Sequence, residues 1–223
     1  MSSQLSVSRL PAGDDATRRR LSPRQAATVA RLGDALLAEL STVDYDGLTV
    51  RGVARRAGVA PATAYTYFTS KAHLVAEVFW RRLRALPDTP ADPAAPAADR
   101  VAAVLRDVAA LVAAEPALGA ACSPALLGPD PDVRHLRDRI GAELHRRVAA
   151  ALAAPPRAGT ADPRPPPAGP PHLDPDPELE HLAEAIDLML AGALLRAGTG
   201  HLRYDAIGDR LASLTRLVIG DRP

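Results

Sequence analysis

Apolar residues recur along this chain at the three- and four-residue spacing of amphipathic helices. The first such segment begins at Ser22-Pro23-Arg24-Gln25, where Ser22 and Gln25 can form a capping box and Pro23 can occupy the first helical position. Its apolar stripe consists of Val29, Leu32, Leu36 and Leu40. We therefore predict a helix from Ser22 to about Thr42. Its stripe should cover the two helices that follow, because two short helices cannot bury enough surface alone.

Two short helices joined by a glycine turn are predicted at the start of the segment Leu48–Trp80. Thr49 can cap the first helix with its side-chain oxygen. The apolar positions that then share one face are Val50, Val53, Ala54 and Ala57. Gly58 ends this helix, because glycine takes the left-handed conformation without a steric penalty. Pro61 opens the second helix, where its missing N–H is not needed. The pattern predicts a helix-turn-helix.

Five more helices are predicted after this motif. They span Ser70–Leu86, Asp99–Glu115, Asp132–Leu152, Glu178–Ala197 and Tyr204–Ile219. Prolines at positions 87, 90, 93 and 96 interrupt the pattern and divide the chain into two parts. Residues 22–86 hold the helix-turn-helix and are called the reader, and residues 87–223 form a helical part called the body. Residues Pro116–Pro131 are predicted to be irregular. The sequence therefore predicts an all-α fold.

Two segments are predicted to lack packed structure. Residues 1–21 show no periodicity and are expected to form a flexible arm, in which Arg18-Arg19-Arg20 either contacts DNA or is simply solvated. Residues 155–177 hold ten prolines in 23 positions, a composition that cannot form a helix and has little to bury. We interpret this segment as a disordered or polyproline loop, with a ligand for a proline-recognition module as the alternative.

Charge is distributed unevenly although the 223-residue chain has a formal net charge of only +1. Residues 1–82 contain 12 Lys and Arg against 7 Asp and Glu, a net charge of +5, so the other 141 residues carry −4. The basic part coincides with the helix-turn-helix. This offset suits a module that faces phosphates, although it is also compatible with ordinary solvated surface.

Composition argues against several classes of protein. A single cysteine, Cys122, permits neither an internal disulfide nor a thiolate metal site, and it fits a reducing cytoplasm. No apolar run approaches the roughly 20 residues of a membrane span. The six histidines show no metal-binding spacing, and neither a phosphate-binding loop nor a nucleophile elbow is present. We expect a cytoplasmic protein without catalytic residues, metal or cofactor.

The second helix and its flanks carry a specific motif: Gly58-Val59, Thr63, Tyr65, Tyr67-Phe68 and Ser70-Lys71 follow the order G-V-x-x-x-T-x-Y-x-Y-F-x-S-K. This motif resembles the DNA-reading segment of the tetracycline-repressor-like (TetR) family. The specific match covers about 35 residues, or about 55 with the preceding helix. The resemblance implies an N-terminal three-helix DNA-binding domain followed by a helical ligand-binding and dimerisation bundle.

Helix-turn-helix geometry places the N-terminal residues of the second helix, Ala62 and Thr63, nearest the base edges. The resemblance makes Tyr65 a base or phosphate contact, Tyr67 a phosphate contact and Lys71 a phosphate clamp. The expected DNA-binding residues are Thr49, Arg51, Arg55, Pro61, Ala62, Thr63, Tyr65, Tyr67 and Lys71. The arginines could instead be solvated surface, and one tyrosine could pack beneath the helix.

The sequence departs from the family pattern at three positions of the reader. Ala60 stands where a capping Ser or Thr is usual, so the second helix loses a cap worth roughly 1 kcal/mol. Ala64 replaces a larger apolar residue, and Thr66 replaces a frequent aromatic residue or histidine. These changes leave the fold prediction intact and the preferred operator sequence open.

The body is expected to dimerise and to bind a small molecule. Two reader helices about 34 Å apart are needed for specific affinity. The expected dimer residues are Leu188, Gly192, Leu195, Leu211, Leu214 and Val218. The expected pocket residues are Trp80, Leu105, Val108, Val112, Leu126 and Met189. For both sets, packing within the monomer core is the alternative. Because aromatic residues make up only 3% of the chain, an aliphatic or compact apolar ligand is favoured.

Three functions remain at this point. The first is a homodimeric repressor that binds a palindromic DNA operator and is released by a small apolar inducer. The second is a helical small-molecule-binding or scaffold protein whose helix-turn-helix no longer reads DNA. A helical enzyme is the third, and no nucleophile or metal site in the sequence supports it.

Overall fold

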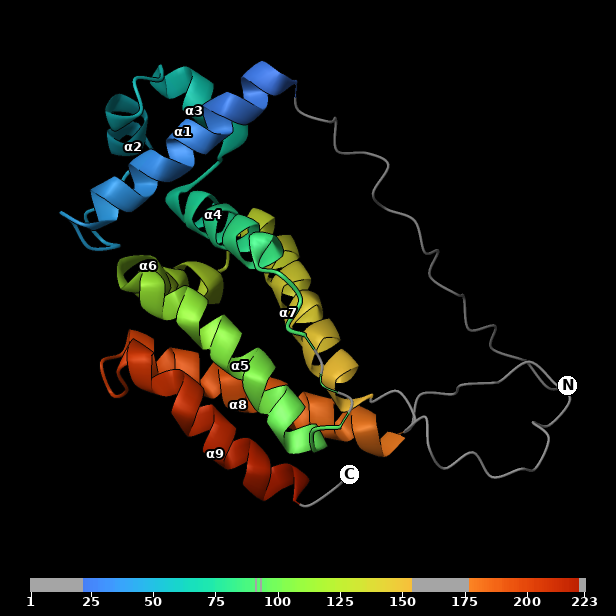
Figure 1. Cartoon of the computed structure of the whole chain (residues 1–223). Coiled ribbons are helices and arrows are strands. Elements are labelled where there is room, and N and C mark those ends of the chain that lie inside the picture. The colour runs from blue at the N-terminus through green and yellow to red at the C-terminus, as the bar shows by residue number, and fades with distance from the viewer. Residues whose placement is uncertain (1–21, 91, 93, 154–176, 221–223) are drawn as a thin grey trace, which may run out of the picture.

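The computed structural model describes residues 22–90, 92, 94–153 and 177–220, which form helices and no strand. The all-α fold predicted from the sequence is confirmed. In chain order the elements are α1 (Pro23–Leu40), α2 (Val50–Arg56), α3 (Pro61–Tyr67), α4 (Lys71–Ala85), α5 (Ala97–Ala114), α6 (Pro116–Leu127), α7 (Pro131–Leu152), α8 (Pro177–Gly198), the short 3-10 helix η1 (Tyr204–Ala206) and α9 (Ile207–Ile219). Figure 1 shows α1, α2 and α3 at one end of the molecule and α8 and α9 at the other.

Local hydrogen bonds start the N-terminal helices where the sequence predicts. The Ser22 side chain accepts a bond from the Gln25 amide, and the Gln25 side chain accepts one from the Ser22 amide, which completes the capping box of α1. Thr49 Oγ1 accepts from the Gly52 amide at the start of α2. The Ser70 side chain accepts from the His73 amide at the start of α4.

The turn between α2 and α3 is a Schellman motif. Gly58 has a φ of 63°, the left-handed conformation that glycine adopts without strain. The Val59 amide donates to the Ala54 carbonyl, and the Gly58 amide donates to the Arg55 carbonyl. Pro61 then occupies the first turn of α3. These bonds fix the direction in which α3 leaves α2.

The buried residues form two core clusters. The first joins α1, α2, α3 and α4 to α6 and to the N-terminal half of α7. The second joins α5, α8, α9 and the C-terminal end of α7. The first cluster runs from the reader into the body, because α4 packs against α1 on one side and against α6 and α7 on the other. The division of the chain into domains at residue 86 stays a prediction.

The prediction for one segment was wrong. Residues Pro116–Pro131 were expected to be irregular, but Pro116–Leu127 form α6. Pro116 lies in the first turn, where proline has no N–H to lose, and only Pro124 lies inside the helix. The buried residues of α6 are Leu118, Gly119, Ala121, Cys122 and Ala125. Their burial against neighbouring helices outweighs the cost of Pro124, an effect that local propensity does not contain.

Some predictions fall where the structure gives no description. The arm at residues 1–21 and its Arg18-Arg19-Arg20 cluster lie outside the described residues. So does the proline-rich segment 155–177, except for Pro177, which begins α8. Within the described residues, no helix combines the length and apolar character needed to traverse a bilayer.

Candidate nucleic-acid interface

Helix α3 is anchored by one face and presents the others to solvent. Ala64 and Phe68 are buried at 0% and 2% relative exposure, and Val59 in the preceding turn is buried as well. Ala62 and Thr63 are exposed, and Tyr65 is 47% exposed. The first turn of α3 is therefore free to approach another molecule while its inner side holds the helix in place.

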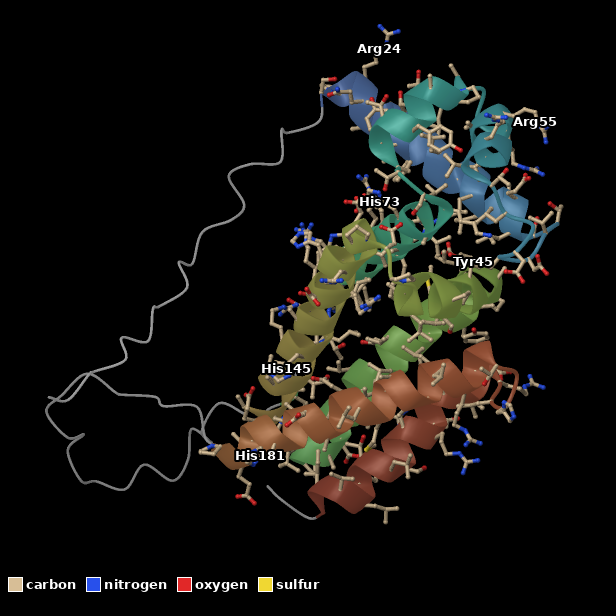
Figure 2. The ribbon with its side chains drawn as sticks, turned by 180° about the vertical axis from the view of Figure 1, so that it is seen from behind. Arg24, Tyr45, Arg55, His73, His145 and His181 are labelled. Atoms are coloured by element: carbon tan, nitrogen blue, oxygen red, sulfur yellow. The ribbon has the colours of Figure 1, made fainter. Side chains whose placement is uncertain are left out.

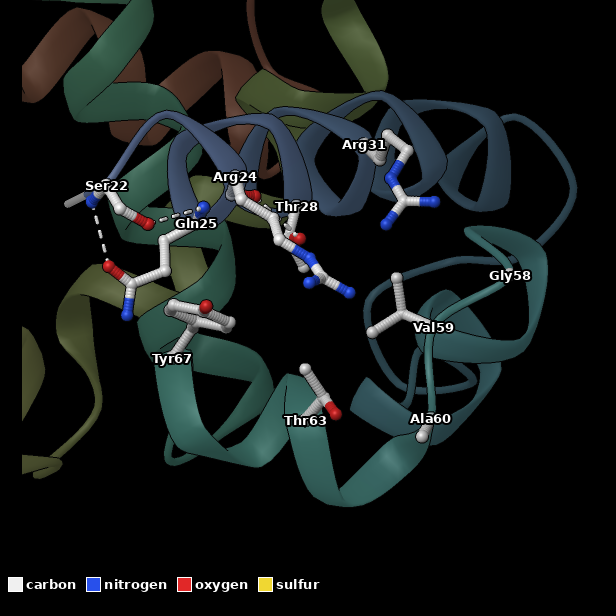
Figure 3. A pocket seen from close by; sticks show the side chains of 10 residues that line it. All are labelled: Ser22, Arg24, Gln25, Thr28, Arg31, Gly58, Val59, Ala60, Thr63 and Tyr67. Atoms are coloured by element: carbon white, nitrogen blue, oxygen red, sulfur yellow. Dashed lines mark hydrogen bonds between the residues drawn. The ribbon is translucent and has the colours of Figure 1, made fainter.

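The ring of Tyr67 is half-buried and lies between α3 and α1. It packs beside Phe68, with ring centroids 6.5 Å apart, and it lies against the first core cluster while also lining a hollow (Figure 3). Neither Thr63 nor Tyr67 is fully buried. The surface that the sequence assigned to DNA contact is thus accessible.

A hollow of about 610 Å³ separates the N-terminal half of α1 from the α2–α3 turn and α3 (Figure 3). It is lined by Ser22, Arg24, Gln25, Thr28, Arg31, Gly58, Val59, Ala60, Thr63 and Tyr67. Arg24 and Arg31 supply its positive charge, and both are exposed. An anionic backbone could lie along this edge of the reader.

Arg24 and Arg31 were missed in the sequence analysis, although a signal was present. With Thr28 they occupy positions spaced by four and three residues on α1, which places all three on one helical face. The apolar stripe of α1 predicts burial whatever its neighbour is. Which neighbour the polar stripe faces depends on where α3 packs, and the spacing alone does not contain that information.

The arginines of α2 differ in their surroundings. The Arg56 side chain bonds Glu39 of α1, which restrains it within the reader. Arg51 and Arg55 are exposed and have no ion-pair partner among the described residues. Figure 2 shows Arg24 and Arg55 extending outward from the same end of the molecule. Arg51 and Arg55 are thus available for phosphate contacts without breaking an ion pair, whereas Arg56 is already paired with Glu39.

Lys71 has a structural role that the sequence analysis did not predict. Its Nζ donates to the carbonyls of Tyr45, at 2.8 Å, and Asp46, at 3.2 Å, and it lies 4.5 Å from the centre of the Tyr45 ring. These contacts hold the α1–α2 loop against the start of α4. An ammonium group has three donors, so one remains for a phosphate. The predicted phosphate contact stays a prediction.

A second site lies in the body as a cavity of about 1110 Å³ between α6, α7 and α8. Its walls are mostly apolar, with Phe79, Ile140, Leu144, Leu190 and Leu194 among them. Of the six residues expected to line a pocket, Val112 and Leu126 line it.

The other four expected pocket residues lie outside this cavity. Leu105 and Val108 are buried in the second core cluster, and Met189 packs against that cluster. Trp80 lies beneath the guanidinium groups of Arg139 and Arg84. All four were expected in the pocket because they are apolar residues of the predicted body helices. The rotation of each helix about its axis decides which of its apolar residues line a cavity and which are buried in the core.

The last two helices carry most of the large apolar side chains that remain exposed. The large apolar residues that are exposed on α8 and α9 are Leu188 at 68%, Leu195 at 45%, Leu214 at 39%, Leu217 at 81% and Val218 at 41%. Gly192 is also exposed, and a Cβ built on it would meet nothing within 4 Å. Leu211, however, is fully buried at 0%, so its assignment to a dimer interface was wrong. Several large apolar side chains left exposed on two neighbouring helices indicate an interaction face.

Nucleophilic or metal chemistry has little support in the body. Among the described residues, no group of three His, Cys, Asp or Glu side chains could hold a metal ion. Cys122 is buried, and burial raises the pKa of its thiol, which keeps it protonated.

Comparison with known proteins agrees with this geometry. The family model described as bacterial regulatory proteins, tetR family, matches residues 32–78, which extend from α1 into α4. An uncharacterized HTH-type transcriptional regulator of Mycobacterium tuberculosis is 43% identical over 198 residues, which cover 88% of this chain and 82% of the relative. The chain belongs to the tetR family of bacterial regulatory proteins. It is therefore a DNA-binding transcriptional regulator and not an enzyme.

Further relatives place this tetR-family regulator among proteins of similar fold. The HTH-type transcriptional repressor KstR of Rhodococcus jostii is 29% identical over 123 residues, covering 55% of this chain and 58% of KstR. A TetR transcriptional regulator from Rhodococcus sp. RHA1 superimposes with a TM-score of 0.64 at 18% identity, over 91% of this chain and all of that chain. The regulator FadR of Bacillus subtilis, solved in complex with stearoyl-CoA, superimposes with a TM-score of 0.61 at 18% identity, over 87% and 99%.

Proposed function

We propose that this tetR-family regulator is a homodimeric repressor that binds a palindromic operator and is released by a small molecule with an apolar body. The observation that carries the proposal is the exposed first turn of α3 flanked by unpaired arginines on α1 and α2. The similarity to a relative named as a transcriptional repressor supports repression rather than activation.

In this proposal α3 enters the major groove with Pro61, Ala62 and Thr63 nearest the bases. The Thr63 methyl group can contact a thymine methyl, and its hydroxyl can bond a base or a phosphate. Tyr65 projects from the next turn. Phosphate contacts on the two flanks would come from Thr49, Arg51 and Arg55 on one side and from Tyr67, Arg24 and Arg31 on the other.

The dimer would form through the exposed apolar face of α8 and α9. Burying large leucines against a second copy removes apolar surface from water at about 25 cal/mol per Å². Two copies related by a two-fold axis would hold their α3 helices about 34 Å apart, which is one turn of DNA. Leu188 and Leu195 both belong to this face and line the cavity. The partner subunit would therefore help to close the ligand site.

Release by a ligand requires a connection between the cavity and the reader, and α7 supplies it. Ile140 and Leu144 of α7 line the cavity. At the N-terminal end of α7, Asp132 Oδ2 accepts a hydrogen bond from Thr69 Oγ1 at 2.7 Å, and the Asp130 carboxylate just before the helix accepts one from Ser70.

The C-terminal half of α7 holds the other end of α4. Buried Arg147 donates to the carbonyls of Leu86, at 2.8 Å, and Pro87, at 3.0 Å, just after α4 ends. A ligand that displaced α7 would thus move both ends of α4 and change the spacing of the readers. It releases DNA only to the extent that it binds the DNA-incompetent arrangement more tightly.

The test is a fluorescence-anisotropy titration of the full chain on DNA flanking its own gene, with Thr63→Ala, Arg24→Gln and Arg203→Gln compared. Arg203 is an exposed arginine between α8 and η1, at the end of the molecule opposite α3 (Figure 1), and serves as the charge-matched control. Thr63→Ala is expected to weaken binding to the operator more than binding to random DNA. Arg24→Gln is expected to weaken both and to lower the slope of log K against log salt by about 1.

Arg203→Gln is expected to bind as the wild type does. Equal operator affinity in all four proteins would refute the assignment of the reader surface. Failure to select any sequence from random oligonucleotides, with small-molecule binding retained, would favour a protein whose helix-turn-helix no longer reads DNA.

A further inference from the structure

The narrow end of the cavity contains a polar cluster in otherwise apolar walls. α7 and α8 converge there (Figure 1), and His145 Nδ1 lies 2.8 Å from Asp187 Oδ2 across the gap. His145 Nε2 lies 3.4 Å from Glu180 Oε1 on the preceding turns of α8. The bond between His145 and Asp187 joins residues 42 positions apart, and both residues line the cavity. Figure 2 shows His145 on α7 close to where that helix meets α8.

The second oxygen of Asp187 has a different environment. Oδ1 is buried, and no described residue donates a hydrogen bond to it. Burial is the main reason that the pKa of Asp187 is raised, and the bond from His145 only partly opposes it. A buried carboxylate oxygen without a donor is costly, and most such atoms in proteins have a partner. Asp187 lines the cavity, so a bound molecule could supply the missing donor.

The charges around this oxygen decide which kind of donor fits. Glu180 and Asp187 both pair with His145, and Glu184 lines the cavity as well. Arg146 also lines the cavity, but its guanidinium is engaged by Glu143 and Asp88. Even with His145 protonated, the carboxylates that face the narrow end outnumber the cations. A ligand group placed there gains from positive charge and loses from negative charge.

The opposite end of the cavity does not reverse this preference. Arg137 lines it, but its guanidinium donates to the carbonyls of Leu126, at 2.6 Å, and Gly128, at 2.9 Å. Those bonds hold the end of α6 in place and engage the Nε and Nη2 edge of the guanidinium, the edge that a side-on carboxylate would use. Between the two ends, the walls offer aliphatic side chains.

We infer that the effector is a lipophilic amine, whose hydrocarbon body fills the cavity and whose ammonium group donates to Asp187 Oδ1. This inference rests on the proposed function, because it names the ligand class of the same cavity. An ammonium ion offers three donors and a full positive charge. An alcohol of the same chain length offers one donor without the charge, and a carboxylate offers neither.

Isothermal titration calorimetry with decylamine, 1-decanol and decanoate, each below its micellar concentration, tests this ranking at one chain length. Decylamine is expected to bind most tightly, 1-decanol more weakly and decanoate least. Asp187→Asn keeps the shape of the side chain and removes its charge, and it should weaken decylamine binding roughly tenfold, the effect of one charge-assisted hydrogen bond. The same variant should change the dissociation constant of 1-decanol by less than a factor of about three.

Asp138→Asn is the matched control, because Asp138 is an exposed carboxylate of α7 outside the cavity lining. It should leave all three affinities unchanged. Decanoate binding as tightly as decylamine, or an Asp187→Asn variant with the wild-type ranking, would overturn the inference and leave the proposed function standing. Failure of all three probes to bind, in protein that still binds its operator, would overturn both the inference and the ligand-responsive part of the proposed function.

Discussion

At the scale of single residues, the His145–Asp187 pair links protonation to stability. The hydrogen bond that His145 donates to Asp187 is the main reason that the pKa of His145 is raised above 6.5. A histidine whose folded pKa is raised contributes stability that is fully present below the unfolded value and is lost as pH rises through the folded value. The raised pKa of Asp187 acts in the same direction, because folding favours its protonated form.

We therefore expect the free energy of unfolding to be higher for the wild type than for His145→Gln. This difference should be largest below pH 6.5 and should shrink toward pH 8. The His145 side chain is 33% exposed, so solvent screening should keep the change below about 1 kcal/mol. Urea denaturation followed by circular dichroism at pH 5.5, 6.5 and 8 measures it. A difference that stays constant or grows with pH would contradict this assignment.

At the scale of elements, α3 begins without a side-chain cap. Ala60 is the N-cap residue, is exposed, and makes no capping hydrogen bond. Ala60→Ser should add a bond to the free amides of the first turn and stabilise the protein by about 1 kcal/mol. Chemical denaturation measures the gain. Ala62→Ser, inside the same helix, is the control and should give no gain, because serine is a weaker helix former than alanine. Equal effects of the two changes would argue against capping as the cause.

The attachment of α7 to α4 can be measured as a coupling energy. The Asp130 carboxylate accepts a hydrogen bond from Ser70, and this bond is the main cause of the lowered pKa of Asp130. Ser70 also caps α4, so Ser70→Ala alone removes two interactions. A double-mutant cycle with Asp130→Asn isolates the contact between the helices, and we expect a coupling of about 1 kcal/mol in unfolding free energy. Additive single effects would show that the contact does not tie the body to the reader.

At the scale of the whole molecule, the exposed apolar face of α8 and α9 should decide the oligomeric state. Leu217 is 81% exposed and contributes little to the monomer core, so Leu217→Glu should leave the helical content unchanged. It should shift sedimentation from dimer to monomer and abolish tight operator binding, since one reader contacts only half of a palindrome. Leu127→Glu, at a 71% exposed leucine of α6, is the control and should remain dimeric. If Leu217→Glu still sediments as a dimer, the interface does not include this face of α9.

Much of the reader could be predicted from sequence because its determinants are local. The capping bonds of Ser22, Thr49 and Ser70 each join residues three positions apart, and Gly58 sets the turn by its own backbone conformation. Interactions of such short range are visible in the order of the residues. Helix α6 was hard to predict because its local signal is misleading. Its prolines indicate a break, and only burial against helices distant in sequence outweighs them.

What the sequence by itself determined is therefore the helical fold, the helix-turn-helix and the exposed residues at the start of α3. Tertiary structure alone decided that Lys71 holds a loop, that Arg24 and Arg31 flank α3, and that Leu211 is core. It also decided the cavity and the meeting of His145 with Asp187. The physical reason is that helix periodicity fixes which residues share a face, whereas the neighbour of that face depends on packing between residues far apart in the chain.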